Sequence, residues 1–512
     1  MKRASLDDLT ARAYDVLVIG GGIYGAMAAR EAVLRGYRTA LVERDDFGSG
    51  TSHNSLKIIH GGIRYVQHLD FARLRASARE QAFWHSAAPD LIRPLEFLIP
   101  LTGWGAKGPG AFAAAALLHG AAARGAGARA FAGAGVFTPK TARRRMNGLA
   151  PAGITGAGHW RDGQIDDANR LLLATLEAAA SGGGALANYM NVETLLRDGQ
   201  NITGARAHDE IGGATGEVTA RIVLCCTGAG TGDLVATGLP EQGAQIFPTF
   251  ARATNLVLNC RFSDAGLGLV SRSRSDAVID RGGRMYFLTP WRGLTIAGTH
   301  ESPARPGENP RDRAQMARDA AAFLAELNHA CPALDLRQED ILHIHSGLIP
   351  ADIDDARANV ARSTRDSLVD HAVHHGVGGL ISVIGVKYTT ARLVCARALD
   401  RAETQLGPKR RAGDASLDTA LPQVADSDCR IDDAASLALR LRTAVDVEMA
   451  RSLSDLVLRR SLLAETGAFA GAGGLPRLRS LARQMGEYCG WDATRLAREV
   501  AACAEELGLT AE

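Results

Sequence analysis

The sequence lacks any stretch of about 20 uncharged apolar residues, so we expect no membrane-spanning helix. The opening residues, MKRASLDDLTARAYD, lack the apolar core of a secretory signal. The chain also has almost no net charge, because 58 Lys and Arg face 56 Asp and Glu. This balance argues against a nucleic-acid partner and against a disordered chain.

The eight cysteines are scattered, and no two of them form a CxxC pair. This spacing gives no reason to expect a zinc site, and we predict no metal. It suits reduced thiols in a cytoplasmic protein better than a disulfide framework. Hydrophobic residues make up 46% of 512 residues, which is enough for two or three domains with a large core.

A complete βαβ unit is predicted near the N-terminus. Val16–Ile19 is typical of a buried parallel strand, Ala26–Leu34 of a helix of small and apolar residues that Gly36 ends, and Thr39–Val42 of the next strand. The pattern predicts a parallel α/β sheet that carries a nucleotide.

Gly20, Gly22 and Gly25 form the motif G-x-G-x-x-G between the first strand and its helix. Such glycines let the backbone approach a pyrophosphate, and the helix N-terminus faces it with positive partial charge. Glu43 ends the second strand, about 20 residues later, where it can accept hydrogen bonds from a ribose hydroxyl. The unit therefore predicts a dinucleotide site.

The rest of the chain favours FAD over NAD. A second buried strand with a Thr-Gly turn is predicted in Arg221–Gly230, and a late glycine-rich turn with a helix in Ile381–Arg392. FAD is long, so an N-terminal adenosine site needs later segments to close around it. No second clear G-x-G-x-x-G appears, so we expect no separate NAD domain and an electron partner other than NADH.

Over its whole length the chain resembles the FAD-dependent glycerol-3-phosphate dehydrogenases of the D-amino-acid oxidase superfamily. The motifs that carry the resemblance are VIGGGIYG, SGTSHNSLKIIHGGIRYVQHLDF, DGQIDDANRLLLATLEAA, TGAG, SVIGVKYTTAR and VEMARSLSDLVLRRSLL. The resemblance implies a Rossmann-like α/β FAD-binding domain interleaved with an antiparallel-sheet substrate domain. Helical periodicity from Asp432 onward adds an all-α C-terminal domain.

These patterns divide the chain into an oxidoreductase core of residues 1–405, a linker of 406–430 and a helical domain of 431–512. Within the core, FAD-binding segments are expected at about 14–90, 150–235 and 340–405, and substrate segments at about 91–149 and 236–339. All expected FAD contacts precede the linker, so truncation near Pro408 is expected to leave a flavin-bound core.

The resemblance also implies which residues meet FAD. Hydroxyls and a charge near the phosphates would come from one loop, the isoalloxazine would lie over His60 and a Gly-Gly turn, and the backbone of Val192 would meet the adenine. The implied cofactor-binding set is Gly20, Gly22, Ile23, Tyr24, Gly25, Glu43, Arg44, Ser49, Thr51, Ser52, Ser55, Lys57, His60, Gly61, Gly62, Val192, Thr227, Gly228, Gly385, Lys387, Tyr388 and Thr389.

The substrate side of the resemblance implies cations around a small anionic substrate. Arg64, Tyr65 and Arg365 match the family's substrate contacts, and Lys387 would stabilise the negative charge of reduced flavin. A base must take the hydroxyl proton, and the candidates by residue type are His60 and His300.

The sequence departs from the family at three places near the expected substrate. Ile349 occupies the position at which relatives that act on glycerol 3-phosphate have an arginine. Ala251 and Asn255 occupy the positions at which those relatives have a basic residue and a histidine. His300 and Glu301 replace a Thr-Asp pair. Arg252 would lie on the opposite face of a regular strand.

We therefore expect oxidation of a secondary alcohol on a small anionic polyol derivative by hydride transfer to flavin N5. Glycerol 3-phosphate itself is expected to be a weak substrate. Two alternatives stay open: an amine or 2-hydroxy-acid oxidase, and a flavin-bound protein with little turnover. Quinone or oxygen is expected as electron acceptor, and the oligomeric state is open, with a homodimer as one option.

Two further segments leave alternatives open. Gly103–Gly135, rich in Ala and Gly, suits either a helix pair in the cytoplasm or a peripheral contact with the inner face of a membrane. Asp166 and Asp167 are expected to cap a helix, and Arg459 and Arg460 to form ion pairs on a solvated face.

Overall fold

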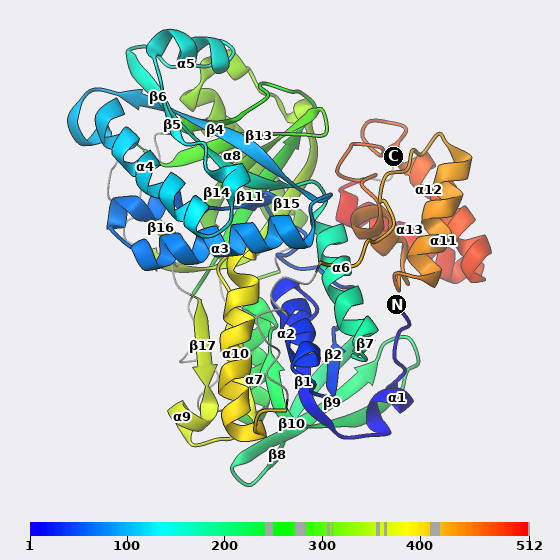
Figure 1. The fold of residues 1–512 in the computed structure, drawn as a ribbon. Coiled ribbons are helices and arrows are strands. Elements are labelled where there is room, and N and C mark those ends of the chain that lie inside the picture. Colours follow the sequence, from blue (N-terminus) through cyan, green and yellow to red (C-terminus); the bar gives the residue numbers. More distant parts are fainter. Residues whose placement is uncertain are drawn as a thin grey trace.

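The computed structural model describes residues 1–240, 249–271, 283–304, 308–309, 311–354, 359–362, 366–409 and 420–509. A sheet of mainly parallel strands and a mostly antiparallel sheet form two halves, and the C-terminal helices α11, α12 and α13 pack beside both (Figure 1). The chain crosses between the two halves several times, so both are built from distant segments.

The first sheet has the strand order β17-β18-β10-β1-β2-β7, with β8 and β9 joined to β10. β1, β2, β7, β10 and β18 run parallel, while β17 runs antiparallel to β18. The strands are β1 (Tyr14–Ile19), β2 (Thr39–Val42), β7 (Ala185–Ala187), β8 (Met190–Asp198), β9 (Asn201–Asp209), β10 (Thr215–Cys225), β17 (Ser367–Asp370) and β18 (Leu380–Ile384).

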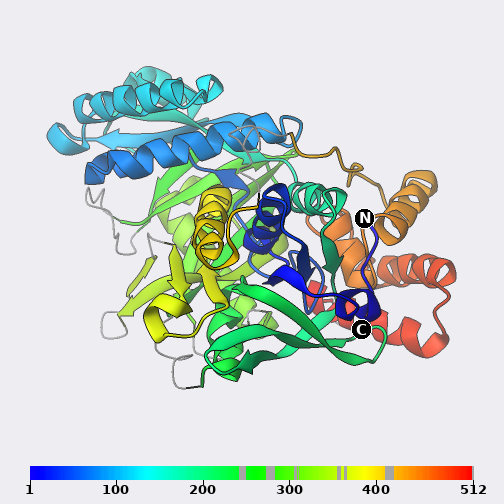
Figure 2. The same ribbon diagram turned by 60° about the horizontal axis from the view of Figure 1, so that its bottom comes forward.

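Three helices cover one face of this sheet and lie side by side in Figure 2. They are α2 (Ile23–Leu34), α6 (Ala168–Ser181) and α10 (Ala391–Leu406). Small side chains such as Ala26, Ala29 and Ala398 are fully buried there. Small residues let helices approach a sheet closely, which explains why this alanine-rich pattern forms the core.

The other face of the first sheet is covered by α1 (Leu6–Thr10), α7 (Thr231–Gly238) and the β8–β9 hairpin. Leu17 and Val223 are fully buried on this side. With both faces covered, the parallel strands are continuous apolar runs, as the sequence pattern of β1 indicates.

The second sheet has the order β16-β15-β11-β14-β13-β12-β4-β6-β3, with β5 paired to β6. Its strands are β3 (Ile58–Ile59), β4 (Ile92–Thr102), β5 (Gly135–Phe137), β6 (Ile154–Ile165), β11 (Phe250–Leu258), β12 (Gly266–Val270), β13 (Met285–Trp291), β14 (Leu294–Pro303), β15 (Ile341–Asp354) and β16 (Asn359–Arg362). Helix α8 (Arg313–Ala330) packs on one face through Phe323 and Leu324.

The remaining helices lie at the edges or in the C-terminal region. The α-helices are α3 (Phe71–Ala87), α4 (Pro109–Gly125), α5 (Pro139–Arg145), α9 (His371–His375), α11 (Ala434–Asp446), α12 (Gly474–Cys489) and α13 (Ala493–Leu507). The 3₁₀ turns are η1 (Ile63–His68), η2 (Gly105–Lys107), η3 (Arg129–Phe131), η4 (Gly228–Gly230), η5 (Pro332–Leu334), η6 (Gln338–Asp340) and η8 (Tyr388–Thr390), and η10 (Asp455–Arg460) is a π-helix.

The predicted fold class is confirmed: parallel α/β and antiparallel sheets interleave, and the C-terminal region is helical. β2 begins and ends where the pattern places it, whereas α2 begins at Ile23, earlier than predicted. Its first amide is satisfied by Ser52 Oγ, which accepts from Ile23 N at 2.9 Å. The exact division into core, linker and C-terminal domain stays a prediction.

Arg459 and Arg460 correct the sequence analysis, because they are buried rather than solvated. Both guanidinium groups donate to the carboxylate of Asp46, which lies just after β2. Asp46 is 1% exposed and Arg460 is 1% exposed. Burial alone raises the pKa of Asp46, but the two arginines outweigh it and lower that pKa.

The C-terminal helices are attached to the core by two further buried ion pairs. Glu448 accepts from Arg170 of α6 and from Arg440 of α11. Glu465 accepts from Lys57 at 2.9 Å, with both side chains at most 1% exposed. Arg170 and Lys57 of the core thus have hydrogen-bonded ion-pair partners in the C-terminal region.

Within the described part of the chain, none of the helices combines the length and the apolar character that crossing a membrane requires.

Candidate active site

The glycine loop lies between β1 and α2, and two of its glycines are required by close backbone packing. A Cβ on Gly25 would lie 1.7 Å from the carbonyl oxygen of Gly20. Gly20 has φ +108°, and its Cβ would lie 2.6 Å from the carbonyl oxygen of Cys226 at the end of β10. Gly22 is less constrained, with Ser52 Oγ at 3.0 Å. The loop can exist in this shape only with glycine at its first and last positions.

Glu43 ends β2 beside this loop, as predicted for a ribose-binding acid. Its carboxylate accepts from the backbone N–H of Gly21 at 2.5 Å and of Asp45 at 3.0 Å. Burial raises the pKa of Glu43. The carbonyl of Glu43 accepts from Met190 N at 2.8 Å, which brings the start of β8, and with it Val192, to this edge. Arg44 is exposed and lies near Asp45.

The loop after β2 packs between the glycine turn and β15. Thr51 Oγ1 donates to the carbonyl of Leu348 at 2.8 Å, and Ser52 Oγ holds the start of α2. Ser55 Oγ accepts from Lys57 N at 3.3 Å, and Ser49 is buried. The hydroxyls of this loop therefore fix its position against both halves of the molecule.

Lys57 corrects the sequence analysis, which places its charge near the phosphates. Its side chain is fully buried, donates to Glu465 of the C-terminal region and lies 5.3 Å from the ring centre of Trp291. The backbone has φ +58° at this residue. The ammonium group thus points toward the C-terminal helices, where Glu465 neutralises it.

The glycine pair Gly61–Gly62 is explained by protein contacts on its Cβ side. A Cβ on Gly61 would lie 2.8 Å from Gln81 Oε1 and 2.9 Å from His119 Nε2. Gly62 has φ +86°, and its Cβ would lie 2.9 Å from Ser77. Contacts with α3 and α4 thus require glycine at both positions, and the expected contact with the flavin ring stays a prediction.

His60 forms a hydrogen-bonded pair with Asp162 of β6. His60 Nδ1 lies 3.1 Å from Asp162 Oδ2, and the N–H of Gly61 donates to Asp162 Oδ1 at 2.7 Å. The His60 side chain is 43% exposed and that of Asp162 is 5% exposed. Burial raises the pKa of Asp162, but the bonds from His60 and Gly61 outweigh it and keep the carboxylate ionised.

Lys387 and Tyr65 form a second pair, and Tyr65 belongs to the same segment of the chain as His60. Lys387 Nζ donates to Tyr65 OH and lies 4.5 Å from the centre of its ring. The backbone N–H of His60 donates to Thr389 Oγ1 at 3.0 Å, which connects the two pairs. Arg64 is exposed in η1 next to Tyr65. Arg365 lies outside the described residues.

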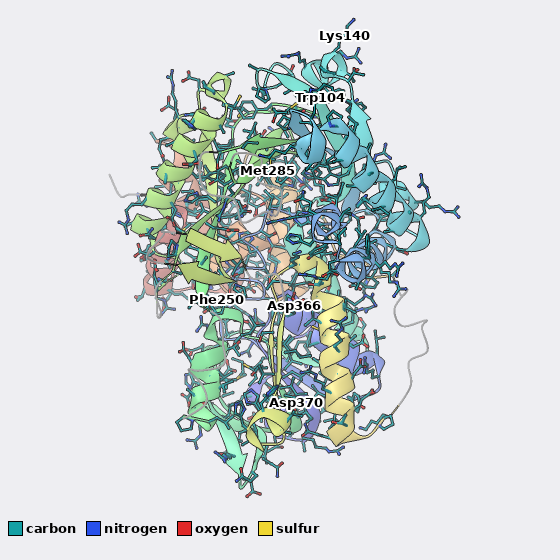
Figure 3. The ribbon with its side chains drawn as sticks, turned by 90° about the vertical axis from the view of Figure 1, so that its left-hand side faces the viewer. Trp104, Lys140, Phe250, Met285, Asp366 and Asp370 are labelled. Carbon is teal, nitrogen blue, oxygen red and sulfur yellow. The ribbon has the colours of Figure 1, made fainter. Side chains whose placement is uncertain are left out.

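Tyr24 connects the glycine loop to the late turn. Its hydroxyl donates to the carbonyl of Lys387 at 2.7 Å and to Asp366, labelled in Figure 3 near the junction of the two halves. A Cβ on Gly385 would lie 1.6 Å from the Tyr24 ring. Tyr388 OH donates to the carbonyl of Ala168 at 3.3 Å, and burial raises its pKa.

The turn after β10 lies next to the glycine loop between β1 and α2. Thr227 Oγ1 lies 3.2 Å from Thr231 Oγ1, and Gly228 has φ +59°. The turn follows directly after Cys226, whose carbonyl lies against Gly20. Gly20, Glu43, Thr227 and Gly385 thus follow the carboxyl ends of β1, β2, β10 and β18, which lie at one edge of the sheet.

On the second sheet, Ala251, Asn255 and Ile349 carry no charge, whereas Glu301, which also departs from the family, pairs with Arg284 at 3.0 Å. Ala251 of β11 pairs in register with Ile349 of β15. Ile349 shares a face with Gly347, whose Cβ would touch Thr51 at 3.0 Å. Asn255 Oδ1 accepts from Thr299 Oγ1 at 2.8 Å. The face toward the loop of Thr51 is therefore apolar or neutral at these places.

Arg252 lies on the opposite face of β11, as predicted for a regular strand. It is fully buried and pairs with Glu308 at 2.5 Å and with Asp319 of α8 at 3.4 Å. His300 also lies on the α8 side, stacked on Phe323 with ring centres 5.5 Å apart. Burial lowers the pKa of His300. This position corrects the expectation that His300 is a candidate base at the flavin.

Sequence reasoning missed Asp162, which is the closest ionised partner of His60. Its neighbour Asp167 does cap α6 through Asn169 and Arg170, as predicted. Asp166 instead pairs with Arg292 and Arg93. Asp162 opens the motif DGQIDDANRLLLATLEAA, and the pairing of β3 with β6, which brings Ile59 beside Gly163, shows why it lies next to His60.

The residues present fit FAD, since a glycine turn, a helix N-terminus and Glu43 meet at one edge of a parallel sheet. The family model DAO, FAD dependent oxidoreductase, matches residues 15–393. The chain belongs to this family. It is an oxidoreductase, and FAD is its cofactor.

Relatives with curated names are similar to this chain. The glycerol-3-phosphate dehydrogenase of Synechocystis is 27% identical over 95% of both chains. The mitochondrial glycerol-3-phosphate dehydrogenase of Homo sapiens is 33% identical over 78% of this chain, which spans 55% of that relative. This chain therefore covers about half the length of the mitochondrial relatives.

Solved structures share the fold. The glycerol-3-phosphate dehydrogenase of Bacillus halodurans, complexed with FAD, has a TM-score of 0.71 at 22% identity, over 99% of this chain and 96% of that one. The L-α-glycerophosphate oxidase of Mycoplasma pneumoniae, with FAD bound, has a TM-score of 0.53 at 14% identity, over 81% and 100%.

Proposed function

We propose that this protein oxidises a secondary alcohol on a small anionic polyol derivative and disfavours glycerol 3-phosphate itself. The observation that carries the proposal is the connection of two pairs, His60–Asp162 and Lys387–Tyr65, through Thr389. A base and a cation next to each other are what alcohol oxidation requires. The similarity to glycerol-3-phosphate dehydrogenases supports the substrate class.

His60 acts as the base in this proposal. Asp162 accepts from Nδ1–H, which leaves Nε2 as the proton acceptor and stabilises the imidazolium formed when the hydroxyl proton is taken. When bound, FAD supplies the acceptor for the hydride. Lys387 holds positive charge beside Tyr65, where it favours the anionic forms that arise during the reaction.

The apolar face at Ile349 sets the preference among substrates. A phosphate dianion that loses water needs several cations in exchange, and isoleucine supplies none. One charge-assisted hydrogen bond contributes roughly 1.5–3 kcal/mol, which corresponds to about a tenfold to hundredfold effect on affinity. Because Arg252 is buried against Glu308 and Asp319, it does not replace the missing arginine. The preferred substrate carries less charge or more apolar surface at that end.

Anaerobic addition of candidate substrates to the FAD-loaded protein tests the proposal. A panel of polyol phosphates, sugar acids, 2-hydroxy acids and amino acids is added, and bleaching of the flavin is recorded. We expect bleaching by a polyol derivative other than glycerol 3-phosphate. Bleaching only by an amino or hydroxy acid would favour an oxidase of that class, and no bleaching would favour a flavin protein with little turnover.

Ile349→Arg tests the specificity argument. It should improve glycerol 3-phosphate oxidation at least tenfold, while Ile349→Met, which adds length without charge, should not. Equal activity of the unmodified protein and the arginine variant on glycerol 3-phosphate would contradict the role assigned to Ile349.

His60→Gln tests the base and should lower kcat by about 10²–10⁴ with FAD still bound. Asp162→Asn should shift the pH profile of the reaction, because it removes the charge that stabilises the imidazolium. An unchanged profile would contradict the dyad.

The electron acceptor and a membrane contact belong to the same proposal. Leu69 is 72% exposed, Trp104 80% and Leu117 75%, on or beside η1, η2 and α4. α4 packs on η1 through Ala115 and Ala122, so these elements share one side; Trp104 is labelled in the upper half of Figure 3. We propose that this side touches the inner face of a membrane and that quinone is the acceptor there. Oxygen consumption without quinone would favour an oxidase.

A further inference from the structure

Three histidines that are distant in sequence meet where the core joins the C-terminal region. His53 comes from the loop after β2, and His343 and His345 come from β15. The ring centres of His53 and His345 are 5.3 Å apart, and those of His343 and His345 are 4.9 Å apart. One ring nitrogen of each lies within 4.8 Å of the others.

Several buried polar atoms at this place have no hydrogen-bond partner among the described residues: His53 Nε2, His345 Nδ1, His345 Nε2 and Glu465 Oε2. Buried polar groups are nearly always paired, and each unpaired one costs about 1–3 kcal/mol. His53, His345 and Glu465 come from three segments, and one ion could take one nitrogen of each ring together with Glu465 Oε2.

The chemistry of the donors suits a metal ion. Imidazole nitrogens are common ligands of divalent first-row transition metals, and a carboxylate often completes such a set. Glu465 uses Oε1 for Lys57, at 2.9 Å, and Oε1 lies 3.3 Å from His345 Nε2, which leaves Oε2 for the ion.

Charges of both signs surround the cluster, since Arg459 lies near His53 and Arg313 near His343. Lys57 is positive, but Glu465 and Asp167 both lie close enough to interact with it electrostatically. His343 is half-buried, and this gives an ion a way in. Asn169 lies 3.0 Å from His53 Nδ1 and holds that ring in place.

We propose that His53, His343 and His345 bind one divalent first-row transition-metal ion, with Glu465 as a fourth ligand, and that Zn²⁺ is the ion that fits best. Imidazole and carboxylate ligands suit Zn²⁺, which has no geometric preference of its own. Nitrogens around tetrahedral zinc lie roughly 3.4 Å apart, so the rings must rotate inward from their present separation.

Such an ion would fasten three segments together. The loop of His53 also carries Thr51 and Ser52 of the cofactor side, and β15 carries Ile349. Glu465 belongs to the C-terminal region. The ion would therefore be structural rather than catalytic, and the inference does not rest on the proposed substrate.

Titration of the FAD-loaded, chelator-treated protein with Zn²⁺ in a calorimeter tests the proposal. We expect one ion per chain, and at least tenfold weaker binding by His343→Gln. His329→Gln, which alters an exposed histidine of α8, serves as the matched control and should bind like the unmodified protein. Flavin absorbance and the thermal midpoint show that each variant is folded.

Co²⁺ gives a second readout, since nitrogen ligands in a four-coordinate site produce visible absorbance beyond the flavin bands. The absorbance should appear with the unmodified protein and His329→Gln and be lost with His343→Gln. Absence of Zn²⁺ binding by the unmodified protein, or equal binding by all three proteins, would overturn the proposal whatever the enzyme oxidises.

Discussion

Two interfaces of this protein are built on opposite principles. The helices that cover the parallel sheet meet it through small apolar residues such as Ala26, Ala29 and Ala398, all fully buried. The C-terminal region meets the core through buried charges, among them Asp46 with Arg460 and Lys57 with Glu465. The first interface gains free energy from burial of apolar surface. When one of its side chains is truncated, a cavity remains, and the cost in stability grows with the size of that cavity.

The charged interface behaves differently when a partner is lost. An unpaired buried charge costs several kcal/mol, because water cannot replace the missing partner. Truncating apolar side chains therefore lowers the stability of the first interface gradually. Removing one partner of a buried ion pair lowers the stability of the second interface sharply, because the other charge stays buried. Each prediction below tests this contrast, starting with the largest expected effect.

Truncation before residue 420 should abolish a folded, FAD-binding core. It removes Glu448, Arg460 and Glu465 and leaves Asp46, Arg170 and Lys57 without their buried partners. This expectation replaces the one drawn from sequence. Soluble expression and flavin content of the truncated chain measure it, and a yellow, soluble product would show that the charged interface is dispensable.

Asp46→Ala should lower the free energy of unfolding by about 3–5 kcal/mol, since Arg459 and Arg460 lose a shared buried partner. Glu217→Ala breaks a surface pair with Arg206, 3.8 Å apart and more than half exposed, and should cost less than about 1 kcal/mol. Chemical denaturation followed by tryptophan fluorescence gives both values. If the two variants lost similar amounts of unfolding free energy, buried and surface ion pairs would not differ in their contribution to stability.

Gly25→Ala should destabilise the apolar interface by about 1–3 kcal/mol and reduce FAD retention, because the new methyl group meets the carbonyl of Gly20. Gly125→Ala, at an exposed position of α4 with no atom within 4 Å, should be neutral or slightly stabilising. Flavin content and thermal midpoints check both. Full FAD content in the Gly25 variant would contradict the packing argument.

Acidification from pH 7 to pH 5 should destabilise the protein in the presence of a chelator. The folded-state pKa values of His53, His343 and His345 lie below the ordinary value of 6.5, so the unfolded chain binds more protons in this range. Their contribution is present above 6.5 and is lost as the pH falls, by up to about 1.4 kcal/mol per pH unit for each group. His343→Gln should flatten the dependence and His329→Gln should not; equal slopes would contradict this assignment.

The apolar interface could be predicted from sequence, because its pattern is local. The strand of Val16–Ile19, the glycine spacing and the alanine-rich helix lie within 30 residues and repeat with the periods of strand and helix. Glu43 follows from the same unit. Helical periodicity after Asp432 predicts the C-terminal helices in the same way, whereas the antiparallel substrate sheet is implied by the family resemblance.

The charged partners could not be predicted in this way. Lys57 and Glu465 are 408 positions apart, and His60 and Asp162 are 102 apart. A charged residue in sequence shows no preference for one distant opposite charge over another. Its partner is fixed only when the sheets bring the segments together, which is why Lys57 was assigned to phosphate and Arg459 to solvent.

The link between Lys57 and Glu465 also bears on the order of synthesis. The ribosome makes the glycine loop, both sheets and α10 before it reaches Glu465, yet the lysine buried among them lacks its hydrogen-bonded carboxylate until that residue emerges. Domains generally fold during synthesis in order from the N-terminus. In this protein, the ion pair of Lys57 can form only after the C-terminal residue Glu465 has been made. A chain interrupted before Glu465 therefore holds a buried ammonium group without the carboxylate that accepts its hydrogen bond.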